Sequence, residues 1–553
     1  MKNLMSMKKF AILGSAVLAF TTLVAIPTNA SAAPACDGKF PVQSCVGATS
    51  DGAPYVMQVP ANFNGTVYLW SHGYRYNVDI PAAMPLIGGY KITNTPEPGP
   101  VIGKDTSVIK YLLGKGFAVM GSGFARQGWN ADSGVATDEE LIKTFEAQFT
   151  TTTHVIAWGN SLGGFITQTL AEKDGAALSA SGPLCVASPT VEAELQMAGD
   201  FLWGLKTYFD PSIKAGNYSP GAAGYAEAMG DLGKVFTVLG KLQAGMATGA
   251  WPDTTPAAIH AVGLDQVPSR SALLLLGLMA GLPTQSAHFD STTGPGSVNS
   301  SAYTSFAAAA SPALAILENG ATAAALAVLV TYDVEQQSGG AIFDNTKTDY
   351  SARVASEATV YNAALSGATA TAGLLGYLAQ APRATASAAA LAKMRSLAQW
   401  TGKITVPTVA MTGVADPVTP AGDLTYMAQQ YAKQWQAEHV ATLGKGRPPY
   451  DLIALFGTTP AHYTTFSALG APITTTAAAN GTNHCNFNAK QYIAVADMLA
   501  YASANGKNLA GGALNTAVRK MGGTTKDLQF APALPKFYAE DQFRVRLKRE
   551  RAL

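Results

Sequence analysis

The chain has 553 residues, with 37 Lys and Arg against 36 Asp and Glu, and charged residues make up only 13% of it. Hydrophobic residues make up 48%, which excludes an intrinsically disordered chain. The net charge of +1 excludes a protein that binds nucleic acid by neutralising many phosphates. The length allows several domains, or one domain with a large insertion.

Residues 1–32 have the pattern of a secretory signal peptide. Residues 1–9 contain three lysines and no acid, residues 10–26 are almost continuously apolar, and small residues precede the expected cleavage after Ala32. We therefore expect a secreted or periplasmic protein without stable membrane insertion after cleavage, and a retained anchor is the alternative. Other apolar runs, such as 273–282, are expected to be too short to cross a bilayer.

Four cysteines are present, and export makes them candidates for disulfide bonds. Cys36 and Cys45 are close in sequence, so a local loop has the smallest closure cost. That pairing leaves Cys185 with Cys485. Metal binding by cysteine is disfavoured because no spacing typical of zinc ligands accompanies these residues.

Strand-like and helix-like segments alternate along both ends of the chain. The expected strands are 65–71, 116–121, 154–158, 177–186 and 404–412, with a weaker β-like segment at 473–476, and the expected helices are 137–149, 162–173 and 492–501. Strands separated by helices predict an α/β fold, with a mostly parallel central sheet flanked by helices.

Residues 189–400 differ in character from the rest. They contain alanine-rich stretches of high helix propensity and few β-branched runs. We interpret 189–400 as a mainly helical insertion that rises from one edge of a catalytic domain formed by 33–188 and 401–553. The alternative is a separate domain in series.

Ser161 is the strongest functional candidate. It lies in a Gly-x-Ser-x-Gly run, from Gly159 to Gly163, directly after an expected strand and directly before an expected helix. In that context the turn raises the serine hydroxyl at a helix N-terminus, where unpaired N–H groups favour developing negative charge. The alternative is a serine that only forms a turn.

A serine nucleophile needs a base, and His484 is our candidate. It lies in a polar loop late in the chain, before the expected helix 492–501. His462 is the main competitor, His154 is expected to be structural, and His72 is of interest for its place beside Gly73.

Asp416 is the candidate carboxylate that orients this histidine. It follows the expected strand 404–412 in a Gly-Val-Ala-Asp-Pro loop. A simple turn or helix-capping role is the alternative, and Asp423 and Asp451 are the alternates.

The oxyanion of a tetrahedral intermediate needs two N–H donors. The backbone of Leu162, which follows the nucleophile, is one candidate, and the backbone of Tyr74, in the loop after the strand 65–71, is the other.

These motifs resemble those of the α/β-hydrolase superfamily, in which the triad occurs in the same chain order, Ser161, Asp416, His484. The resemblance covers about 50–188 and 401–500 and implies that 189–400 forms a cap over the site. The His484-Cys485 pair also resembles a pair found in tannase and feruloyl-esterase relatives. In those proteins a cysteine directly precedes the nucleophile, whereas this chain has Asn160 at that position, so we do not adopt that assignment. A bond between Cys185 and Cys485 could still fix the histidine loop.

The resemblance implies a serine hydrolase, with cleavage of carboxylic esters as the first choice by fold-level analogy. A serine exopeptidase of the prolyl- or tripeptidyl-aminopeptidase kind is the alternative, because Glu192, Glu194 and Asp200 could hold a substrate amino group. A third interpretation is a catalytically inactive binding protein. A hydrophobic cap would suit lipid, polyester or aromatic esters, although its alanines fit plain helix packing as well.

We expect a small-molecule or polymeric ester as the partner, no nucleic acid, no cofactor and no metal. The expectation about cofactors rests on the lack of a phosphate-binding glycine loop and of a metal-ligand cluster in the sequence. Residues 544–551 form a basic tail, which we expect to be solvated. The sequence leaves the oligomeric state open.

Overall fold

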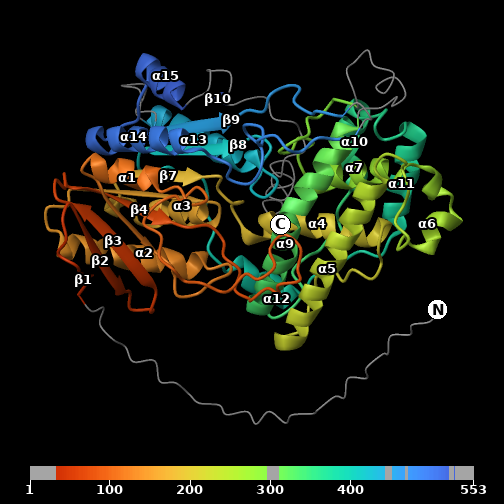
Figure 1. The fold of residues 1–553 in the computed structure, drawn as a ribbon, viewed down its shortest axis with the longest axis horizontal. Helices are drawn as coiled ribbons and strands as arrows, with labels where there is room; N and C mark the ends of the chain where they lie inside the picture. The colour runs from red at the N-terminus through yellow and green to blue at the C-terminus, as the bar shows by residue number, and fades with distance from the viewer. Residues whose placement is uncertain (1–32, 295–309, 442–450, 468–470, 522–527, 530–553) are drawn as a thin grey trace, which may run out of the picture.

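The computed structural model describes residues 33–294, 310–441, 451–467, 471–521 and 528–529. The expected signal peptide (1–32) and basic tail (544–551) lie outside the described residues. Figure 1 shows a sheet with its flanking helices on the left and a second group of helices on the right.

Ten strands form one sheet. They are β1 (Ala35–Cys36), β2 (Val42–Ala48), β3 (Pro54–Pro60), β4 (Thr66–Ser71), β5 (Ala118–Ser122), β6 (His154–Asn160), β7 (Ala180–Leu184), β8 (Thr408–Gly413), β9 (Leu452–Gly457) and β10 (Leu528–Gln529). The order is β1-β2-β3-β5-β4-β6-β7-β8-β9-β10. Pairing is parallel from β5 through β4, β6, β7 and β8 to β9 and antiparallel at both ends.

The parallel strands are apolar along their length because helices cover both faces of the sheet. Every residue of β5, β7 and β8 is buried. One core cluster packs the sheet against α2 (Ala131–Gln148), α3 (Leu162–Asp174) and α13 (Ala421–Ala441). A second packs it against α1 (Ser107–Gly114), α14 (Ala489–Asn505) and α15 (Gly511–Lys520). This arrangement confirms the expected fold class.

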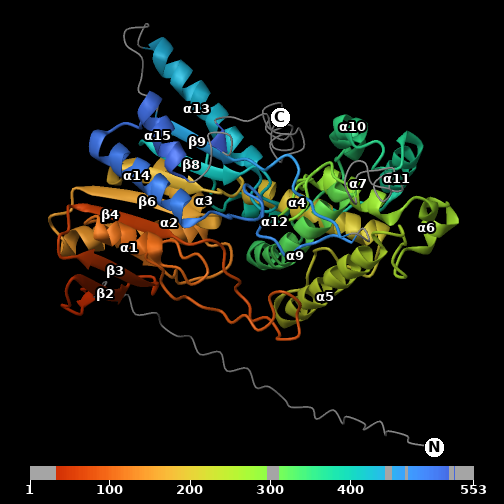
Figure 2. The same cartoon turned by 45° about the horizontal axis from the view of Figure 1, so that its top comes forward.

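The chain between β7 and β8 is helical, with no strand in its described residues, 185–294 and 310–407. Its helices are α4 (Val191–Tyr208), α5 (Gly221–Gly245), α6 (Ala257–Ala261), α7 (Ser269–Ala280), α9 (Ser311–Ser338), α10 (Tyr350–Val360), α11 (Ala368–Gln380) and α12 (Ala388–Arg395). Most of these helices share a third core cluster, whereas Ala390 and Met394 of α12 belong to the first cluster, which also covers the sheet. The helices lie beside the sheet in both views (Figures 1 and 2).

The two ends of this helical segment meet at its base. The Trp400 N–H donates a hydrogen bond to the Pro189 carbonyl at 3.1 Å. The indole Nε1–H of Trp400 donates to the Ala187 carbonyl at 3.0 Å. Chain entering and chain leaving the segment therefore lie side by side.

Helix α9 corrects one expectation from the sequence. It has 28 residues and a mean hydropathy of 1.8 in its most apolar window, so by length and composition it could cross a membrane. In this fold 72% of that window is buried inside the protein. The helix is apolar because it is the central helix of the insertion, in contact with α4, α5, α7 and α12.

Two local expectations also need correction. Helix α2 begins at Ala131 rather than at 137. The segment 473–476 forms no strand, and the strand that precedes the histidine loop is β9, which the sequence analysis did not identify. Two short 3₁₀ turns, Gly175–Ala177 and Leu264–Gln266, complete the described elements.

Candidate active site

Ser161 occupies a sharp turn between β6 and α3, as its motif predicts. Its backbone is in a rarely populated region, with φ 58° and ψ −123°. A Cβ on Gly163 would overlap the Ser71 carbonyl oxygen of β4, so this position needs glycine for close approach. The turn therefore holds the hydroxyl at the first turn of α3, beside the end of β4.

The structure brings the three candidate side chains together. His484 Nε2 lies 2.9 Å from Ser161 Oγ, and His484 Nδ1 lies 3.0 and 3.1 Å from the two oxygens of Asp416. With the proton on Nδ1, the ring donates to the carboxylate and accepts the serine proton at Nε2. Residues 323 positions apart are thus joined in one hydrogen-bonded chain.

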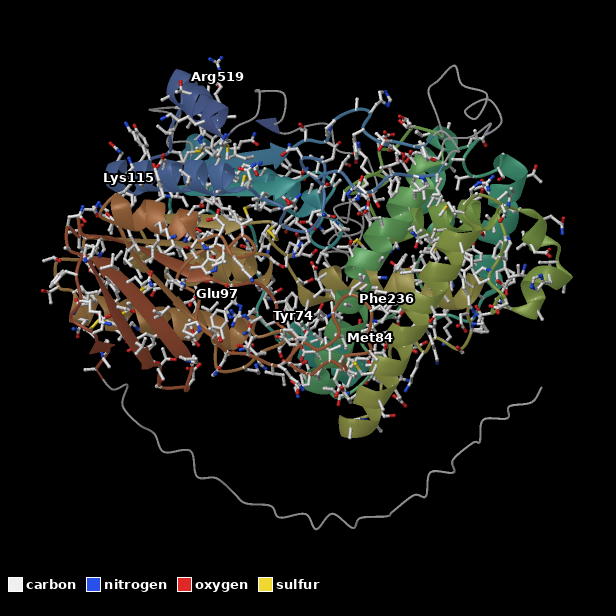
Figure 3. The ribbon with its side chains drawn as sticks, in the orientation of Figure 1. Tyr74, Met84, Glu97, Lys115, Phe236 and Arg519 are labelled. Carbon is white, nitrogen blue, oxygen red and sulfur yellow. A yellow bond between two sulfur atoms is a disulfide. The ribbon has the colours of Figure 1, made fainter. Side chains whose placement is uncertain are left out.

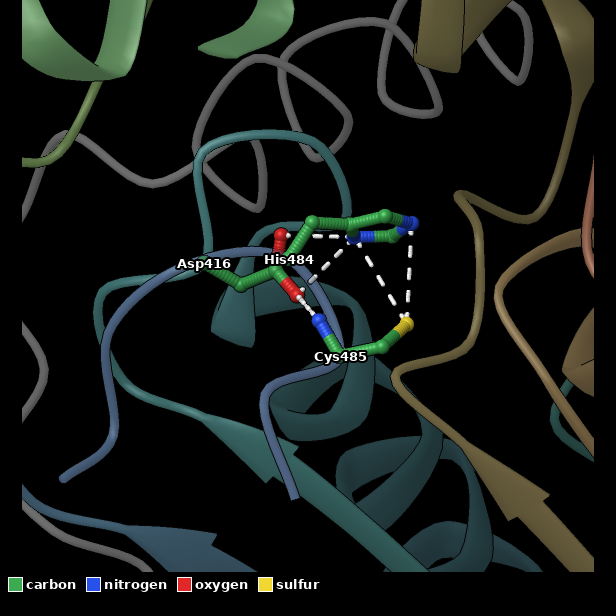
Figure 4. Close-up of side chains that lie close together, drawn as sticks. All are labelled: Asp416, His484 and Cys485. Atoms are coloured by element: carbon green, nitrogen blue, oxygen red, sulfur yellow. Dashed lines mark hydrogen bonds and ion pairs between the residues drawn. The ribbon is translucent and has the colours of Figure 1, made fainter. Parts of the chain in front are cut away.

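The carboxylate of Asp416 is fixed by backbone donors. The N–H groups of Val418 and Thr419 donate to Oδ1, at 2.9 and 3.0 Å, and the N–H of Cys485 donates to Oδ2 at 2.9 Å (Figure 4). Hydrogen bonds of this kind to a charged acceptor are stronger than neutral ones. The loop that carries His484 therefore also holds its partner acid.

The histidine loop is attached to the sheet at two places. Gly481 has φ +71°, and a Cβ there would overlap the Gly457 carbonyl at the end of β9. A disulfide joins Cys485 to Cys185, which directly follows β7. The other expected disulfide, Cys36–Cys45, is also present. The base is thus tied to strands on both sides of β8.

Two buried groups at the site have shifted pKa values. Burial lowers the pKa of His484, but the charge and hydrogen bond of Asp416, together with the charge of Glu194, raise it above its usual 6.5. Burial raises the pKa of Glu194 to about 7, although the hydrogen bonds from Ser188 and the charge of His484 lower it. Glu194 and His484 therefore influence each other electrostatically.

The two candidate oxyanion donors border the nucleophile. Leu162 is the first residue of α3, so its N–H has no partner four residues earlier within the helix. The Tyr74 N–H makes no hydrogen bond to any described residue, and both residues line a cavity together with Ser161. Figure 3 shows Tyr74 at the junction between the sheet and the helical insertion.

The competing candidates lie elsewhere. His462 is exposed and 3.2 Å from Thr292 of the insertion. Asp423 accepts a hydrogen bond from Ser188. Asp451 precedes β9 at its amino end, and His154 begins β6, at the end of the strand remote from Ser161.

The three acids considered for binding an amino group have different surroundings. Glu192 is paired with Arg395, and Asp200 is buried and paired with Arg353. Only Glu194 of the three lines the cavity at Ser161.

Asp416, His484 and Cys485 offer potential metal ligand atoms within 4.8 Å of one another. The Cys485 sulfur is committed to a disulfide and cannot act as a thiolate ligand. Asp416 and His484 hydrogen-bond to each other, and His484 also to Ser161, so this cluster is better explained as part of the triad.

Two cavities meet at Ser161, and both are also lined by Tyr74 and Leu326. The first, which we call the apolar cavity, has walls that include Leu195, Met197, Phe201, Leu282, Ala323 and Val330 of the insertion. The second, which we call the polar cavity, has walls that include Trp70, Glu97, Asn160, His484 and Tyr492.

Asp333, a buried acid on α9, is not among the residues predicted from the sequence. It accepts hydrogen bonds from the Tyr74 hydroxyl, the Asn77 amide and the Trp129 N–H. Its position in an apolar helix was a usable signal, because a buried carboxylate needs several partners.

No protein-family model matches the chain, and no curated protein matches its sequence. Among solved structures it is similar to feruloyl esterase B from Aspergillus oryzae, with 13% identity, TM-score 0.34, and coverage of 87% of this chain and 80% of that one. It is also similar to an esterase from the same organism, with 11% identity, TM-score 0.32, and coverage of 75% and 71%. The ligand-bound rice cell wall degrading esterase LipA from Xanthomonas oryzae has 11% identity, TM-score 0.27, and coverage of 76% and 82%.

The strand order, the parallel centre of the sheet and the serine turn between β6 and α3 define the α/β-hydrolase fold. The candidate acid and base follow β8 and β9, at the edge of the sheet where parallel strands end. Catalytic groups of open α/β sheets occur at this edge.

Proposed function

We propose that the protein is an exported serine hydrolase that cleaves carboxylic esters. The hydrogen-bonded chain from Ser161 through His484 to Asp416, at 2.9 and 3.0 Å, is the observation that carries this proposal. Cys36–Cys45 and Cys185–Cys485 support export because disulfides persist in oxidising compartments.

In the first half of the reaction, Ser161 Oγ attacks the ester carbonyl while His484 Nε2 takes the hydroxyl proton. The N–H groups of Leu162 and Tyr74 stabilise the oxyanion, which is the step where preorganised donors contribute most. The carbon–oxygen bond to the alcohol then breaks, and His484 returns the proton to the leaving oxygen.

In the second half, water replaces the alcohol. His484 removes a proton from the water, and the hydroxide oxygen bonds to the acyl carbon. The bond to Ser161 Oγ then breaks as His484 returns the proton to that oxygen, which regenerates the free hydroxyl. Asp416 stabilises the imidazolium in both halves. The products are a carboxylic acid and an alcohol, and no cofactor is needed.

The helical insertion acts as a cap in this proposal. Helices α4 and α9 supply Leu195, Phe201 and Leu326 to the apolar cavity beside the nucleophile. A cap over an acyl-enzyme excludes bulk water and strengthens the electrostatic interactions within the site.

Labelling with a fluorophosphonate probe tests the nucleophile. We expect labelling of the wild-type protein and none of Ser161→Ala, with p-nitrophenyl ester turnover falling by at least 10⁴-fold. Ser188→Ala, a change at a serine near the site but outside the triad, is the matched control and should retain labelling. Labelling that persists in Ser161→Ala would contradict the proposal.

An exopeptidase is the second candidate, and Glu194 favours it because a carboxylate beside the nucleophile could hold a substrate ammonium group. With a pKa of about 7, however, Glu194 is largely neutral in weakly acidic solution and a weak counter-ion there. Comparison of p-nitrophenyl esters with aminoacyl p-nitroanilides separates the two activities. Protein inert to the esters, the anilides and the fluorophosphonate would favour a binding protein.

A further inference from the structure

The chain between β9 and α14 packs on the helical insertion before it reaches His484. We call residues 473–480 of this connection the strap. The Ala479 N–H of the strap donates a hydrogen bond to the Ala287 carbonyl at 2.9 Å, and the Thr476 carbonyl lies 3.0 Å from Nε2 of His288. The insertion therefore holds the chain just ahead of the proposed catalytic base.

His288 has an oxygen acceptor at each of its two ring nitrogens. Nδ1 lies 2.6 Å from Oε1 of Glu318 on α9, and Nε2 lies 3.0 Å from the Thr476 carbonyl. A neutral imidazole carries only one N–H and cannot donate to both oxygens. The imidazolium, with a proton on each nitrogen, satisfies both contacts at once.

Glu318 is arranged as an acceptor for this charge. Its Oε2 accepts the Ser286 hydroxyl at 2.6 Å and the His288 backbone N–H at 3.1 Å, so three donors converge on one carboxylate. Burial lowers the pKa of His288, but the hydrogen bond and charge of Glu318 and the hydrogen bond to the Thr476 carbonyl raise it above its usual 6.5. Geometry and electrostatics therefore both favour the protonated ring.

Three other titratable groups lie at this contact among the described residues. Asp290 accepts the Tyr463 N–H at 3.0 Å. Burial raises the pKa of Asp290, but hydrogen bonds from its neighbours lower it below its usual 3.8. Burial raises the pKa of Tyr463 well above 10, so neither group changes charge near neutral pH. His462 faces Thr292, at 3.2 Å.

Loss of the Nε2 proton would leave two lone pairs facing each other, one on His288 and one on the Thr476 carbonyl. A hydrogen bond from a charged donor would thus become a repulsive contact. Glu318 is on the same helix as Ala323 and Leu326, which line the apolar cavity. The contact at His288 therefore joins a wall of that cavity to the strap.

We propose that His288 is a positioning residue that acts as a pH-dependent latch: its imidazolium ties α9 to the strap ahead of His484, and its neutral form releases the strap. The effect of the latch on ester hydrolysis rests on the proposed function. Because folding raises the pKa of His288, the stabilisation is complete below about pH 6.5 and is lost as pH rises through the folded-state value.

Hydrogen exchange of the strap measures the latch directly. In the wild-type protein, strap peptides analysed by mass spectrometry should be at least about tenfold less protected at pH 9 than at pH 6, after correction for the intrinsic pH dependence of exchange. His288→Gln has no ring to titrate, so its strap should show the lower protection at both pH values. Equal protection of the wild-type strap at both pH values would overturn the proposal.

His260→Gln is the matched control. His260 Nδ1 lies 3.0 Å from Asp265 Oδ2, so this histidine is also paired with a carboxylate, but both residues belong to the insertion. Its strap should exchange as in the wild type. An equal loss of protection in His260→Gln and His288→Gln would contradict the latch.

Glu318→Gln is the second variant, for use if His288→Gln fails to fold. It keeps the shape of the side chain but removes the charge that raises the pKa of His288. The pH at which the strap loses protection should therefore move to a lower value than in the wild type. An unchanged midpoint would count against the latch.

The effect on catalysis is measured as the ratio of kcat/KM for His288→Gln to that for the wild type, with p-nitrophenyl butyrate. We expect a ratio of about 0.3 or less at pH 6 that rises toward one at pH 9, because the wild-type latch is then open as well. A residue with only a structural role would give the same ratio at every pH. A constant ratio would overturn the positioning role.

Fluorophosphonate labelling separates the latch from the proposed function. If the probe labels the protein and esters are hydrolysed, but strap protection does not depend on His288, the latch fails and the proposed function stands. If labelling and turnover are both absent while strap protection still depends on pH through His288, the proposed function fails and the latch stands.

Discussion

The hydroxyl of Tyr74 donates a hydrogen bond to Asp333 Oδ2 at 3.2 Å and so joins the loop after β4 to helix α9 of the insertion. Asp333 is 1% exposed, and its Oδ2 also accepts the Trp129 N–H at 2.6 Å. The residue whose backbone is proposed to bind the oxyanion is thus positioned by an acid of the insertion. In this way the insertion can influence the chemical step without contacting the reacting atoms.

Asp333→Asn should therefore impair catalysis more than substrate binding. The amide cannot accept all of these hydrogen bonds, so the Tyr74 loop shifts, and we expect kcat to fall about 10- to 100-fold with little change in KM. Tyr74→Phe removes one of these bonds and should cost only a few-fold. The checks are kcat and KM with p-nitrophenyl butyrate, together with inhibition by a boronic acid. Wild-type kcat in Asp333→Asn would contradict the positioning role.

The pH profile of kcat/KM should report His484. The imidazole must be neutral to accept the serine proton, so activity falls as pH drops through its pKa, about tenfold per unit below it. Because the pKa of His484 is raised, the acidic limb should have an apparent pKa above 6.5. Glu194→Gln removes one charge that raises it, so the limb should move to lower pH. An apparent pKa below 6 for the acidic limb of the wild-type profile would be inconsistent with the site.

Glu194 should also make folding stability depend on pH. Its pKa rises from the usual 4.5 to about 7 on folding, so between these values the folded state binds more protons than the unfolded state. Stability contributed by this group therefore falls as pH rises through that window. Relative to wild type, Glu194→Gln should gain stability from pH 4.5 to 7 and then level off, as measured by urea unfolding. A stability difference between Glu194→Gln and the wild type that does not change with pH would refute Glu194 as the origin of this pH dependence.

The two disulfides should have different consequences. Cys185–Cys485 closes a loop of 300 residues, and its removal with serines should cost on the order of 5 kcal/mol. Because the same bond holds the His484 loop, kcat should also fall at least tenfold under conditions where the variant stays folded. Cys36–Cys45 spans nine residues, and its removal should cost about 3 kcal/mol with kcat retained. Equal kcat in both serine variants would argue against a role for the long bond in catalysis.

The apolar cavity should set the length of the acyl chain. Ala323→Phe places a ring inside it, so the rate with p-nitrophenyl octanoate should fall about tenfold or more relative to p-nitrophenyl acetate. Thr322→Phe is the matched control, because Thr322 precedes Ala323 on α9 but is exposed. If Ala323→Phe lowers the rates with p-nitrophenyl octanoate and p-nitrophenyl acetate by the same factor, the apolar cavity does not bind the acyl chain.

The arrangement of the candidate site could be predicted from the sequence where the signal is local. The turn at Ser161 is encoded by five consecutive residues between an apolar strand and a helix, and Asp416 and His484 each lie in a loop that follows a strand. The expected strands correspond to β4, β5, β6, β7 and β8, because buried parallel strands are continuously apolar. The antiparallel strands β2 and β3 and the parallel strand β9 were not predicted.

Contacts between distant segments could not be predicted in this way. Helix α2 begins at Ala131, and its first turns approach α3 at Gly134, where a Cβ would lie only 2.8 Å from Ile166. Asp333 acquires its partners Tyr74 and Trp129 from segments more than 200 positions earlier. Such partners depend on tertiary packing, which hydrophobic periodicity and secondary-structure propensity do not encode.

Two hydrogen bonds from Trp400, to Pro189 and to Ala187, close the base of the helical segment. A short turn could bridge Pro189 and Trp400, although removal of the segment would also take Val330, Val334, Ala390 and Met394 out of the core cluster that covers the sheet. A chain shortened in this way would keep its nucleophile, base and acid but lose Asp333. Comparison of the shortened and complete enzymes would therefore separate what the sheet alone can catalyse from what the added helices contribute.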